Sequence, residues 1–263
     1  MRMRIWSSDR LVIWSLLLAS LGATRAASGQ TTLPYDHVHL AAPDQAAAVE
    51  WYRKNLGGQL SAEGKDRVTF GKTRFIFLKA DAAKPSAGTA IDHIGFSFAD
   101  LDAKMKELEA AGVKIVTPVR DVAGLFKLGF IEDPWGVKIE VVQDPETLGF
   151  HHVHLRAPDP DASLAWYKAR FGGETAKLKG RIDGLKYGDV WVLVAKGDAI
   201  PSVGHAIDHV GWRVPDLDQT LAALKARDIK ILQGPTALTL ATGVVHYSFV
   251  EDPAGTKIEI VQR

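Results

Sequence analysis

The chain has 263 residues, of which 46% are hydrophobic and 24% are charged. This composition is typical of a globular protein and excludes a disordered, collagen-like or membrane-bundle chain. Cysteine is absent, which excludes disulfide frameworks, thiolate metal sites and cysteine nucleophiles. The formal net charge of +1 and the lack of a Lys/Arg run argue against nucleic acid as a partner.

The N-terminus has the pattern of a secretory signal peptide. Three arginines lie within the first ten residues, and a mostly apolar stretch follows over residues 11–23. Small residues precede Ala26 at the spacing that a signal peptidase reads, so residues 1–26 are expected to be removed. The apolar stretch is shorter than the roughly 20 residues of a transmembrane helix, although an uncleaved anchor is the alternative. We therefore expect a periplasmic or secreted bacterial protein with no membrane contact beyond the signal peptide.

The rest of the sequence consists of two similar halves. The motif DHVHL at 36–40 recurs as HHVHL at 151–155, and AIDHIG at 90–95 recurs as AIDHVG in the second half. The period is far longer than the roughly 20–50 residues of a solenoid repeat, so it indicates a duplicated domain. We expect one domain over 33–145 and a second over 148–263.

In chain order, each half is predicted to contain two rounds of strand, helix and further strands. In the first half, helices are expected over 45–56 and 100–111, because Gly57-Gly58 and Gly112 follow as helix stops. Alternating or β-rich runs predict the strands, which are expected over 37–42, within 67–79, and over 91–98, 113–116, 125–131 and 137–142. The predicted fold class is therefore α+β, with each domain a pair of βαβββ units that form a cupped mixed sheet.

All nine histidines lie in or beside predicted strands. Because strand side chains alternate, His37 and His39 share one face, while Val38 and Leu40 point toward the core. The same alternation places a metal-capable side chain on the non-core face of six strands: His37, His93 and Glu140 in the first half, and His152, His209 and Glu259 in the second.

Two imidazoles and a carboxylate on one concave face provide nitrogen and oxygen ligands for a divalent metal. Fe(II) or Mn(II) is the expected ion, with Zn(II), Ni(II) or Co(II) as alternatives. Open coordination positions would let a small oxygen-bearing substrate bind the metal directly. The alternative is that each histidine is only a hydrogen-bonded strand residue, but the occurrence of the same triplet twice favours metal binding.

These motifs resemble the vicinal oxygen chelate superfamily. This superfamily includes glyoxalase I, extradiol ring-cleavage dioxygenases, fosfomycin resistance enzymes and bleomycin-binding proteins. The resemblance covers both halves as two tandem domains, and it rests on the histidine motifs and on the EDPWGVKIE segment at 132–140 with its counterpart. It implies a metal site in each domain, held by His37, His93 and Glu140 in the first and by His152, His209 and Glu259 in the second.

Two departures from the patterns of that superfamily narrow the expected chemistry. Glyoxalase I has a further ligand acid on the fourth strand, where residues 75–78 and 191–194 are apolar here, so a proton-shuttling isomerase would lack half of its carboxylate pair. Fosfomycin and extradiol enzymes place a tyrosine where this sequence has Phe130 and Phe249. Oxygenase-like chemistry fits the two-His-one-Glu triad best.

Three further residues are candidates for proton transfer or substrate contact: His39, His154 and Tyr247. The two histidines share the face of the ligand histidines, although a strand histidine bonded to a neighbour is the alternative. Tyr247 is expected to face the second cup.

We expect structural roles for two lysines and three aspartates that lie near the ligands in the sequence. Lys138 and Lys257 are expected to be solvated at the rim of each cup, with neutralisation of an anionic ligand as the alternative. Three aspartates directly precede a ligand histidine, and alternation predicts that they point away from it: Asp36, Asp92 and Asp208.

The sequence thus predicts an exported metal-dependent enzyme with dioxygenase-like or lyase/isomerase chemistry, acting as a monomer or homodimer on a small-molecule substrate. The alternative is a metal-free small-molecule binding protein of the bleomycin-resistance type. A third possibility is one active domain beside one scaffold domain.

Overall fold

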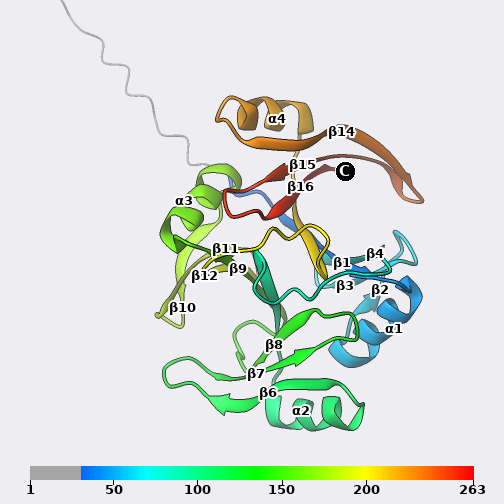
Figure 1. Cartoon of the computed structure of the whole chain (residues 1–263), viewed down its shortest axis with the longest axis vertical. Coiled ribbons are helices and arrows are strands. Elements are labelled where there is room, and N and C mark those ends of the chain that lie inside the picture. The colour runs from blue at the N-terminus through cyan, green and yellow to red at the C-terminus, as the bar shows by residue number, and fades with distance from the viewer. Residues whose placement is uncertain (1–30) are drawn as a thin grey trace, which may run out of the picture.

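The computed structural model describes residues 31–263, in which four βαβββ units follow one another along the chain (Figure 1). The expected signal peptide lies outside the described residues. The first unit contains β1 (Tyr35–Ala42), α1 (Gln45–Leu56), β2 (Gln59–Leu60), β3 (Arg67–Phe70) and β4 (Thr73–Lys79). The second contains β5 (Ile91–Ser97), α2 (Leu101–Ala110), β6 (Lys114–Asp121), β7 (Lys127–Glu132) and β8 (Lys138–Val142).

The second half of the chain repeats this order. The third unit contains β9 (Gly149–Ala157), α3 (Pro160–Phe171), β10 (Glu174–Leu178), β11 (Ile182–Tyr187) and β12 (Val190–Lys196). The fourth contains β13 (Ile207–Arg213), α4 (Leu217–Lys225), β14 (Lys230–Leu240), β15 (Gly243–Glu251) and β16 (Lys257–Gln262).

Every helix begins at an aspartate that caps its first turn. The carboxylate accepts a hydrogen bond from the backbone N–H three residues later, which satisfies one of the free donors at a helix start. The capping residues are Asp44, Asp100, Asp159 and Asp216. Helix α1 ends at Gly57, whose φ of 80° is the left-handed conformation that glycine adopts readily, as the Gly-Gly pair predicts.

The strands form two eight-stranded mixed sheets, which confirms the α+β class. Sheet I has the order β14-β15-β16-β13-β1-β4-β3-β2, and sheet II has the order β10-β11-β12-β9-β5-β8-β7-β6. Each sheet therefore joins one unit from the first half of the chain to one unit from the second half (Figure 1).

This pairing corrects the expectation that each half of the sequence builds its own cup. Strand β1 pairs antiparallel with β13, and β5 pairs antiparallel with β9, so the strands that meet at the centre of each sheet come from different halves. In sheet I, His39 lies opposite His209 across this junction. In sheet II, His93 lies opposite His154.

One continuous core joins the two sheets. Tyr35 packs between Trp212 and Phe150, with ring centroids 5.2 and 6.2 Å away. Phe75 of β4 contacts Phe150 of β9 at 4.9 Å, so aromatic rings of both sheets interdigitate.

Two tyrosines of the helices tie each sheet to the other. Tyr52 of α1 donates a hydrogen bond to Asp133 in the β7–β8 turn at 2.9 Å, and Tyr167 of α3 donates one to Asp252 in the β15–β16 turn at 2.8 Å. Burial raises the pKa of Asp133 to about 6 and also raises the pKa of Asp252.

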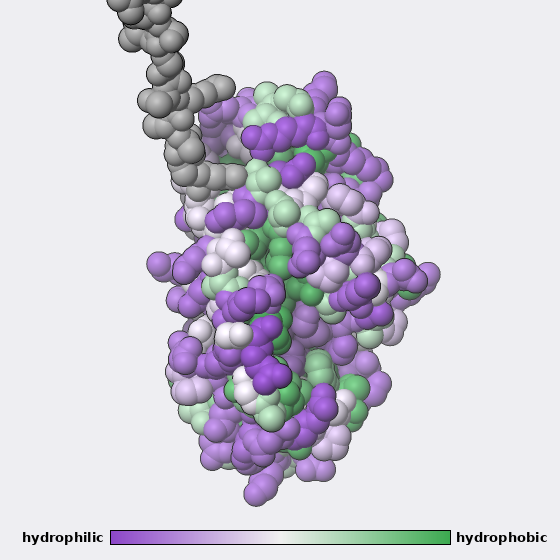
Figure 2. Space-filling model, turned by 90° about the vertical axis from the view of Figure 1, so that its left-hand side faces the viewer, coloured by the Kyte–Doolittle hydropathy of each residue, from purple (hydrophilic) through white to green (hydrophobic). Residues whose placement is uncertain are grey.

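On the side of the molecule where β10 lies, apolar residues form a band between hydrophilic ones (Figure 2). Within residues 31–263, none of the helices has the length and apolar character needed to cross a bilayer.

Candidate metal centre

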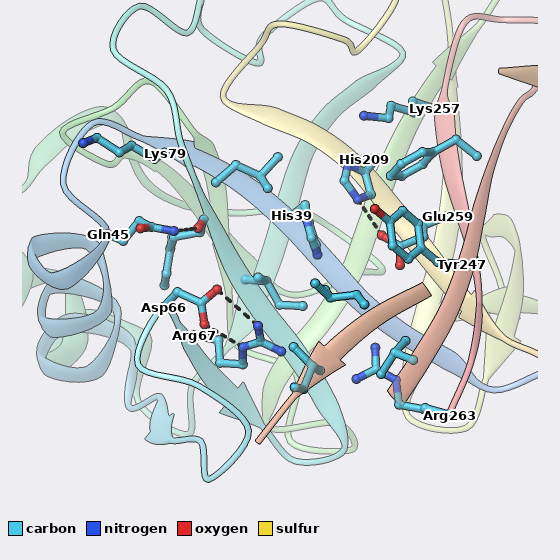
Figure 3. Close-up of a pocket in the computed structure, with 17 residues that line it drawn as sticks. His39, Gln45, Asp66, Arg67, Lys79, His209, Tyr247, Lys257, Glu259 and Arg263 are labelled. Atoms are coloured by element: carbon cyan, nitrogen blue, oxygen red, sulfur yellow. Dashed lines mark hydrogen bonds and ion pairs between the residues drawn. The ribbon is translucent and has the colours of Figure 1, made fainter. Parts of the chain in front are cut away.

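Sheet I curves around a cavity of about 310 Å³ (Figure 3). The β14–β15 hairpin contributes apolar residues to its wall, and β3 and β4 line the opposite side. Five of the residues singled out from the sequence as ligands, as candidates for proton transfer or as charged neighbours line this cavity: His39, His209, Tyr247, Lys257 and Glu259.

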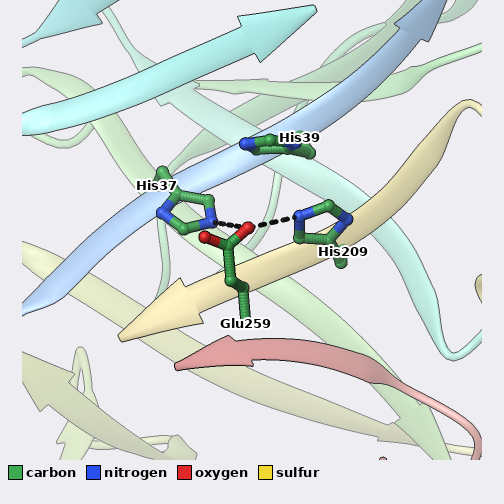
Figure 4. A group of neighbouring side chains, drawn as sticks. All are labelled: His37, His39, His209 and Glu259. Atoms are coloured by element: carbon green, nitrogen blue, oxygen red, sulfur yellow. Dashed lines mark hydrogen bonds and ion pairs between the residues drawn. The ribbon is translucent and has the colours of Figure 1, made fainter. Parts of the chain in front are cut away.

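Site I consists of His37, His39, His209 and Glu259, which lie together in sheet I (Figure 4). One carboxylate oxygen of Glu259 lies 3.4 Å from His37 Nε2 and 3.0 Å from His209 Nε2. One potential donor atom from each of the four residues lies within 4.8 Å of the others.

Site II consists of His93, His152, His154 and Glu140 in sheet II. The Glu140 carboxylate lies 3.1 Å from His93 Nε2 and 3.1 Å from His152 Nε2. Its four donor atoms also lie within 4.8 Å of one another.

The two sites combine the predicted ligands differently from the expectation. His37 joins His209 and Glu259 rather than His93 and Glu140, and His152 joins His93 and Glu140. The reason is the strand pairing: β1 and β13 are neighbours in sheet I, whereas β1 and β5 lie in different sheets. Alternation of side chains selected residues that lie together in the structure, but it carries no information about which distant strands pair.

One histidine in each site lies opposite a glycine, which makes room for its imidazole. Gly211 of β13 is the register partner of His37, and Gly95 of β5 is the register partner of His152. A Cβ at either glycine would overlap the ring of the opposite histidine. The AIDH-x-G motif of each half is thus shaped to receive a histidine from the other half.

The aspartates before three ligand histidines do not point away from them, contrary to the expectation from alternation. The Nδ1 atoms of His37, His93 and His209 donate to Asp36, Asp92 and Asp208 at 2.9, 2.6 and 2.6 Å. Each aspartate lies where the register of the β1–β13 or β5–β9 pair shifts, and such irregularities break strict alternation. These contacts fix the ring orientation and direct Nε2 toward the site.

Lys138 and Lys257 bind two of these aspartates instead of standing free at the rim. Lys138 Nζ lies 2.6 Å from Asp92, and Lys257 Nζ lies 2.8 Å from Asp208. Burial acts to raise the pKa of Asp92 and Asp208, but the histidine and lysine partners outweigh it and hold each pKa well below its usual range.

The fourth ligand histidine, His152, is oriented by another histidine. Its Nδ1 lies 2.8 Å from His151 Nδ1, and His151 Nε2 donates to Asp144 at 3.2 Å. Burial and the neighbouring His152 lower the pKa of His151 to about 4, so it is neutral and accepts from His152. Asp144 in turn pairs with Lys179 at 2.8 Å.

Sheet I has different charged residues around the equivalent places. Asp36 stands where His151 stands in sheet II, and it binds Arg263 at 2.7 Å and Arg74 at 3.2 Å. Glu63 binds both arginines, at 2.5 and 3.3 Å. The two sites therefore have the same ligands within different charged surroundings.

In site I the carboxylate is already in its metal-binding form, whereas His37 has to release a proton before it can bind a metal. Burial acts to lower the pKa of His37, but Glu259 and Asp36 raise it to about 9. Burial acts to raise the pKa of Glu259, but His37 and His209 hold it well below its usual range. Burial, together with His209 and His37, lowers the pKa of His39 well below its usual range. A neutral imidazole and an ionised carboxylate are the forms that bind metal.

An orphaned nitrogen atom supports the fit of these residues to a metal. His39 Nδ1 is buried without a hydrogen-bond partner among residues 31–263, and His37 Nε2 and His152 Nε2 lie near only the carboxylate of their own site, at 3.4 and 3.1 Å. A buried polar atom left unpaired is costly, and a bound ion removes that cost. The donor set of imidazoles with one carboxylate suits Fe(II), Co(II), Ni(II) and Zn(II), and Mn(II) more weakly.

Apolar side chains fill the cup of sheet II beside site II. Trp191 and Leu193 of β12 are the register partners of His152 and His154, so they lie on the same face. Both are buried in a cluster with Leu178. In sheet I the corresponding register partners are Arg74 and Ile76, and the cavity remains open there.

Tyr247 and Phe249 lie in the wall of the cavity in sheet I. Tyr247 and Glu259 both line the cavity, on the neighbouring strands β15 and β16 (Figure 3). The Phe249 ring meets His209 edge-on, with centroids 5.0 Å apart, and lies under Lys257 at 4.2 Å. The sequence expectation that Tyr247 faces a cup is consistent with this position, but the cup is shared with β1 of the first half.

Sequence reasoning missed the residues that surround the ligands. His151 and Asp144 had no assigned role, because alternation places His151 on the opposite face from His152. Arg74 and Arg263 carried no motif. The one available signal was the pair of glycines in AIDHIG and AIDHVG, which marks where another group approaches the backbone.

Comparisons with known proteins agree with this architecture. The family model of the Glyoxalase/Bleomycin resistance protein/Dioxygenase superfamily matches residues 35–141 and 149–260. A search of curated proteins finds no match.

Among solved structures, glyoxalase I from Zea mays is similar with a TM-score of 0.71 and 20% identity, covering 88% of this chain and 92% of that chain. A putative dioxygenase from Bacillus subtilis has a TM-score of 0.60 and 14% identity, covering 88% of this chain and 86% of that chain. At these identities the likeness shows the fold alone.

Proposed function

Because the chain belongs to the Glyoxalase/Bleomycin resistance protein/Dioxygenase superfamily, we propose that it is an exported metal-dependent enzyme whose active site is site I. The observation that carries the proposal is the position of the His37–His209–Glu259 cluster beside an open cavity of about 310 Å³. Catalysis needs both a ligand set and space for a substrate, and site I combines them.

The residues of site I would divide the work between holding the ion and holding the substrate. His37, His209 and Glu259 would bind a divalent metal, which supplies Lewis-acid or redox chemistry when bound. Asp36 and Asp208 keep the two imidazoles in the orientation that binding requires.

The cavity indicates the class of substrate. Leu238, Leu240 and Val245 offer an apolar surface, and Lys79 and Gln45 add polar groups on the opposite side. These features suit a small molecule with an apolar body and neighbouring oxygen atoms that reach the metal. Tyr247 lies in the wall where it would contact such a substrate.

The chemistry we favour is dioxygenase-like. Strand β4 has no acid beside site I, since Ile76 and Leu78 line the cavity there, so an isomerase with a pair of carboxylates is disfavoured. Lyase or isomerase chemistry that uses a single base remains the second choice.

Site II would hold a metal without taking part in turnover. Trp191, Leu193 and Leu178 occupy the space that a substrate would need. This asymmetry supports the view that one site is active and the other stabilises the scaffold.

The test is an aerobic screen of catechol-like substrates with the metal-loaded protein and two matched variants. We expect turnover in the wild type and in His93→Ala, which alters site II, and loss of turnover in His209→Ala, which alters site I. Equal loss in both variants, or loss only in His93→Ala, would contradict the assignment of site I. A protein that binds no metal and still binds small molecules would instead be of the bleomycin-resistance type.

Export is tested separately from catalysis. The mature protein should be found in the periplasm or medium with Ala27 as its first residue. Mass spectrometry of fractionated cells measures this directly, and an intact N-terminus in the cytoplasm would contradict export.

A further inference from the structure

We propose that His39 is a fourth protein ligand of the metal in site I, and that His154 is its counterpart in site II. The inference rests on the metal binding in the proposed function and extends it, because it changes the donor set from two imidazoles and a carboxylate to three imidazoles and a carboxylate.

The position of His39 within sheet I supports this role. It lies two residues after His37 on β1 and faces the same side, with ring centroids 4.8 Å apart. Its register partner on β13 is His209, and the two ring centroids are 4.1 Å apart. Figure 4 shows the His39 ring beside the rings of His37 and His209.

The bonding of His39 differs from that of its neighbours. The Nδ1 atoms of His37 and His209 donate to Asp36 and Asp208, whereas His39 Nδ1 is buried without a partner in the described part of the chain. A nitrogen that no protein group satisfies, beside three other donor atoms, is explained if it binds the same ion.

His39 also lies next to the strand position that lacks an acid. Its register partner on β4 is Ile76, so the fourth strand offers no oxygen donor at this level of the cup. The imidazole reaches the same space from β1. His39 therefore supplies the donor that β4 does not.

The second copy separates a ligand role from a substrate-contact role. His154 has equivalent register partners, His93 and Leu193, although its Nδ1 lies 3.1 Å from His93 Nε2 and is therefore not orphaned as His39 Nδ1 is. The buried side chains of Trp191 and Leu193 lie on the same face beside it, which leaves less room for a substrate next to His154 than next to His39. Metal ligation is the one role that His39 in the open cup of sheet I and His154 in the apolar cup of sheet II can share.

A third imidazole has consequences for the choice of metal and substrate. It favours Fe(II), Co(II), Ni(II) or Zn(II) over Mn(II), because these ions bind nitrogen ligands more tightly. Four protein donors leave two positions of a six-coordinate ion, which is the number that two neighbouring substrate oxygens need.

The test measures Co(II) binding to the chain without residues 1–26 by chelator competition and by the visible absorption of Co(II). We expect His39→Ala to weaken one of two sites by about tenfold or more, since even residues that only orient ligands cost about 10–100-fold, and to change the absorption spectrum. His39→Glu, which returns an oxygen donor, should recover most of the affinity. His154→Ala should weaken the other site.

Two controls keep the outcomes distinct. His205→Ala removes a half-buried histidine that belongs to neither site and whose Nδ1 lies 3.3 Å from the Val203 carbonyl oxygen, so it should leave both affinities unchanged. Circular dichroism of the metal-free variants checks folding, and His39→Gln replaces His39→Ala if the latter does not fold.

The results separate this inference from the proposed function. Wild-type affinity and spectrum in His39→Ala, together with loss of one equivalent in His209→Ala, would overturn the ligand role of His39 and leave the metal site standing. Wild-type metal binding in both His39→Ala and His209→Ala would overturn the ligand role of His39 and also the proposed metal site.

Discussion

Four of the six histidines in the two candidate sites have a side-chain partner at Nδ1, on the side of the ring away from the site. Asp36, Asp92 and Asp208 accept directly from a ligand imidazole, and His151 takes this place for His152. An imidazole fixed in this way has its Nε2 lone pair available in one orientation, so less ordering is needed when a metal binds.

Removal of one orienting charge should weaken binding at one site. We expect Asp208→Asn to lower the metal affinity of site I by about 10–100-fold while site II is unchanged. Chelator competition with two-site analysis measures both affinities. Asp216→Asn is the matched control, because Asp216 caps α4 and contacts neither site. Equal affinities in wild type and Asp208→Asn would contradict the orienting role.

The space beside Gly211 should be as important for metal binding in site I as the ligands themselves. We expect Gly211→Ala to displace the His37 ring, because the new Cβ would overlap it, and thus to lower both the stability and the metal affinity of site I. Gly234→Ala is the matched control, since a Cβ at 234 would meet no atom within 4 Å. Thermal unfolding and metal titration of both variants measure the effect. Similar behaviour of the two variants would argue that the His37 ring does not need a glycine at position 211.

At this scale, the sequence singled out six residues that do lie in the two candidate sites, but not the partners of these residues. Alternation works where the ladder is regular, as at Val38 and His39. It fails at Asp36 and Asp92, because the register shifts beside them turn the aspartate toward the following histidine. Such shifts arise from pairing with a distant strand, so local sequence patterns do not reveal them.

At the scale of elements, helices α1 and α3 link the two sheets through hydrogen bonds of their tyrosines. Helix α1 packs on β3 and β4 of sheet I, yet its Tyr52 reaches Asp133 in the β7–β8 turn of sheet II. Asp133 also accepts from the backbone N–H groups of Trp135 and Val137, so one carboxylate fixes both the turn and the helix.

The raised pKa of Asp133 predicts a pH-dependent contribution to stability. Because its pKa is about 6 in the folded protein and lower when unfolded, its contribution is full below the unfolded pKa and is lost as the pH rises through about 6. Asp133→Asn removes this titration. The stability of the wild type relative to Asp133→Asn should therefore decrease between pH 4 and pH 8, as measured by urea unfolding. A constant difference across that range would contradict the assignment.

The apolar filling of sheet II should stabilise the fold and shield site II. We expect Trp191→Ala to lower the free energy of unfolding by about 3–5 kcal/mol, because it leaves a cavity in a buried cluster. Metal in site II should then exchange faster with a chelator, whereas exchange at site I should be unchanged. Urea unfolding and exchange rates test this, and unchanged exchange at site II would show that Trp191 does not cover it.

Most elements of secondary structure could be predicted from the sequence. The α1 boundaries agree with the periodicity over 45–56 and the Gly-Gly stop, because capping and helix stops are local effects. The two-residue strand β2 was missed, since so short a segment has no pattern of its own. Strand β6 extends to Asp121, beyond the expected 113–116, because its pairing with β7 continues past the apolar residues.

At the scale of the whole molecule, neither half of the sequence supplies all residues of a candidate metal site. The central junctions β1–β13 and β5–β9 bring together strands from different halves, and the cross-sheet hydrogen bonds of Tyr52 and Tyr167 strengthen this arrangement. The duplication was evident from the repeated motifs. The exchange of partners was not, because both pairings would satisfy the same alternation and bury the same faces.

The measurement that tests the account most directly is the number of metal ions per chain in two double variants, by elemental mass spectrometry. His37→Ala/Glu259→Ala alters two residues of site I and should retain one of two equivalents. His37→Ala/His93→Ala alters one residue in each site and should retain none. The opposite result, with one equivalent retained only by His37→Ala/His93→Ala, would show that each half of the sequence holds its own metal. Absence of metal from the wild type would contradict the metal-centred account as a whole.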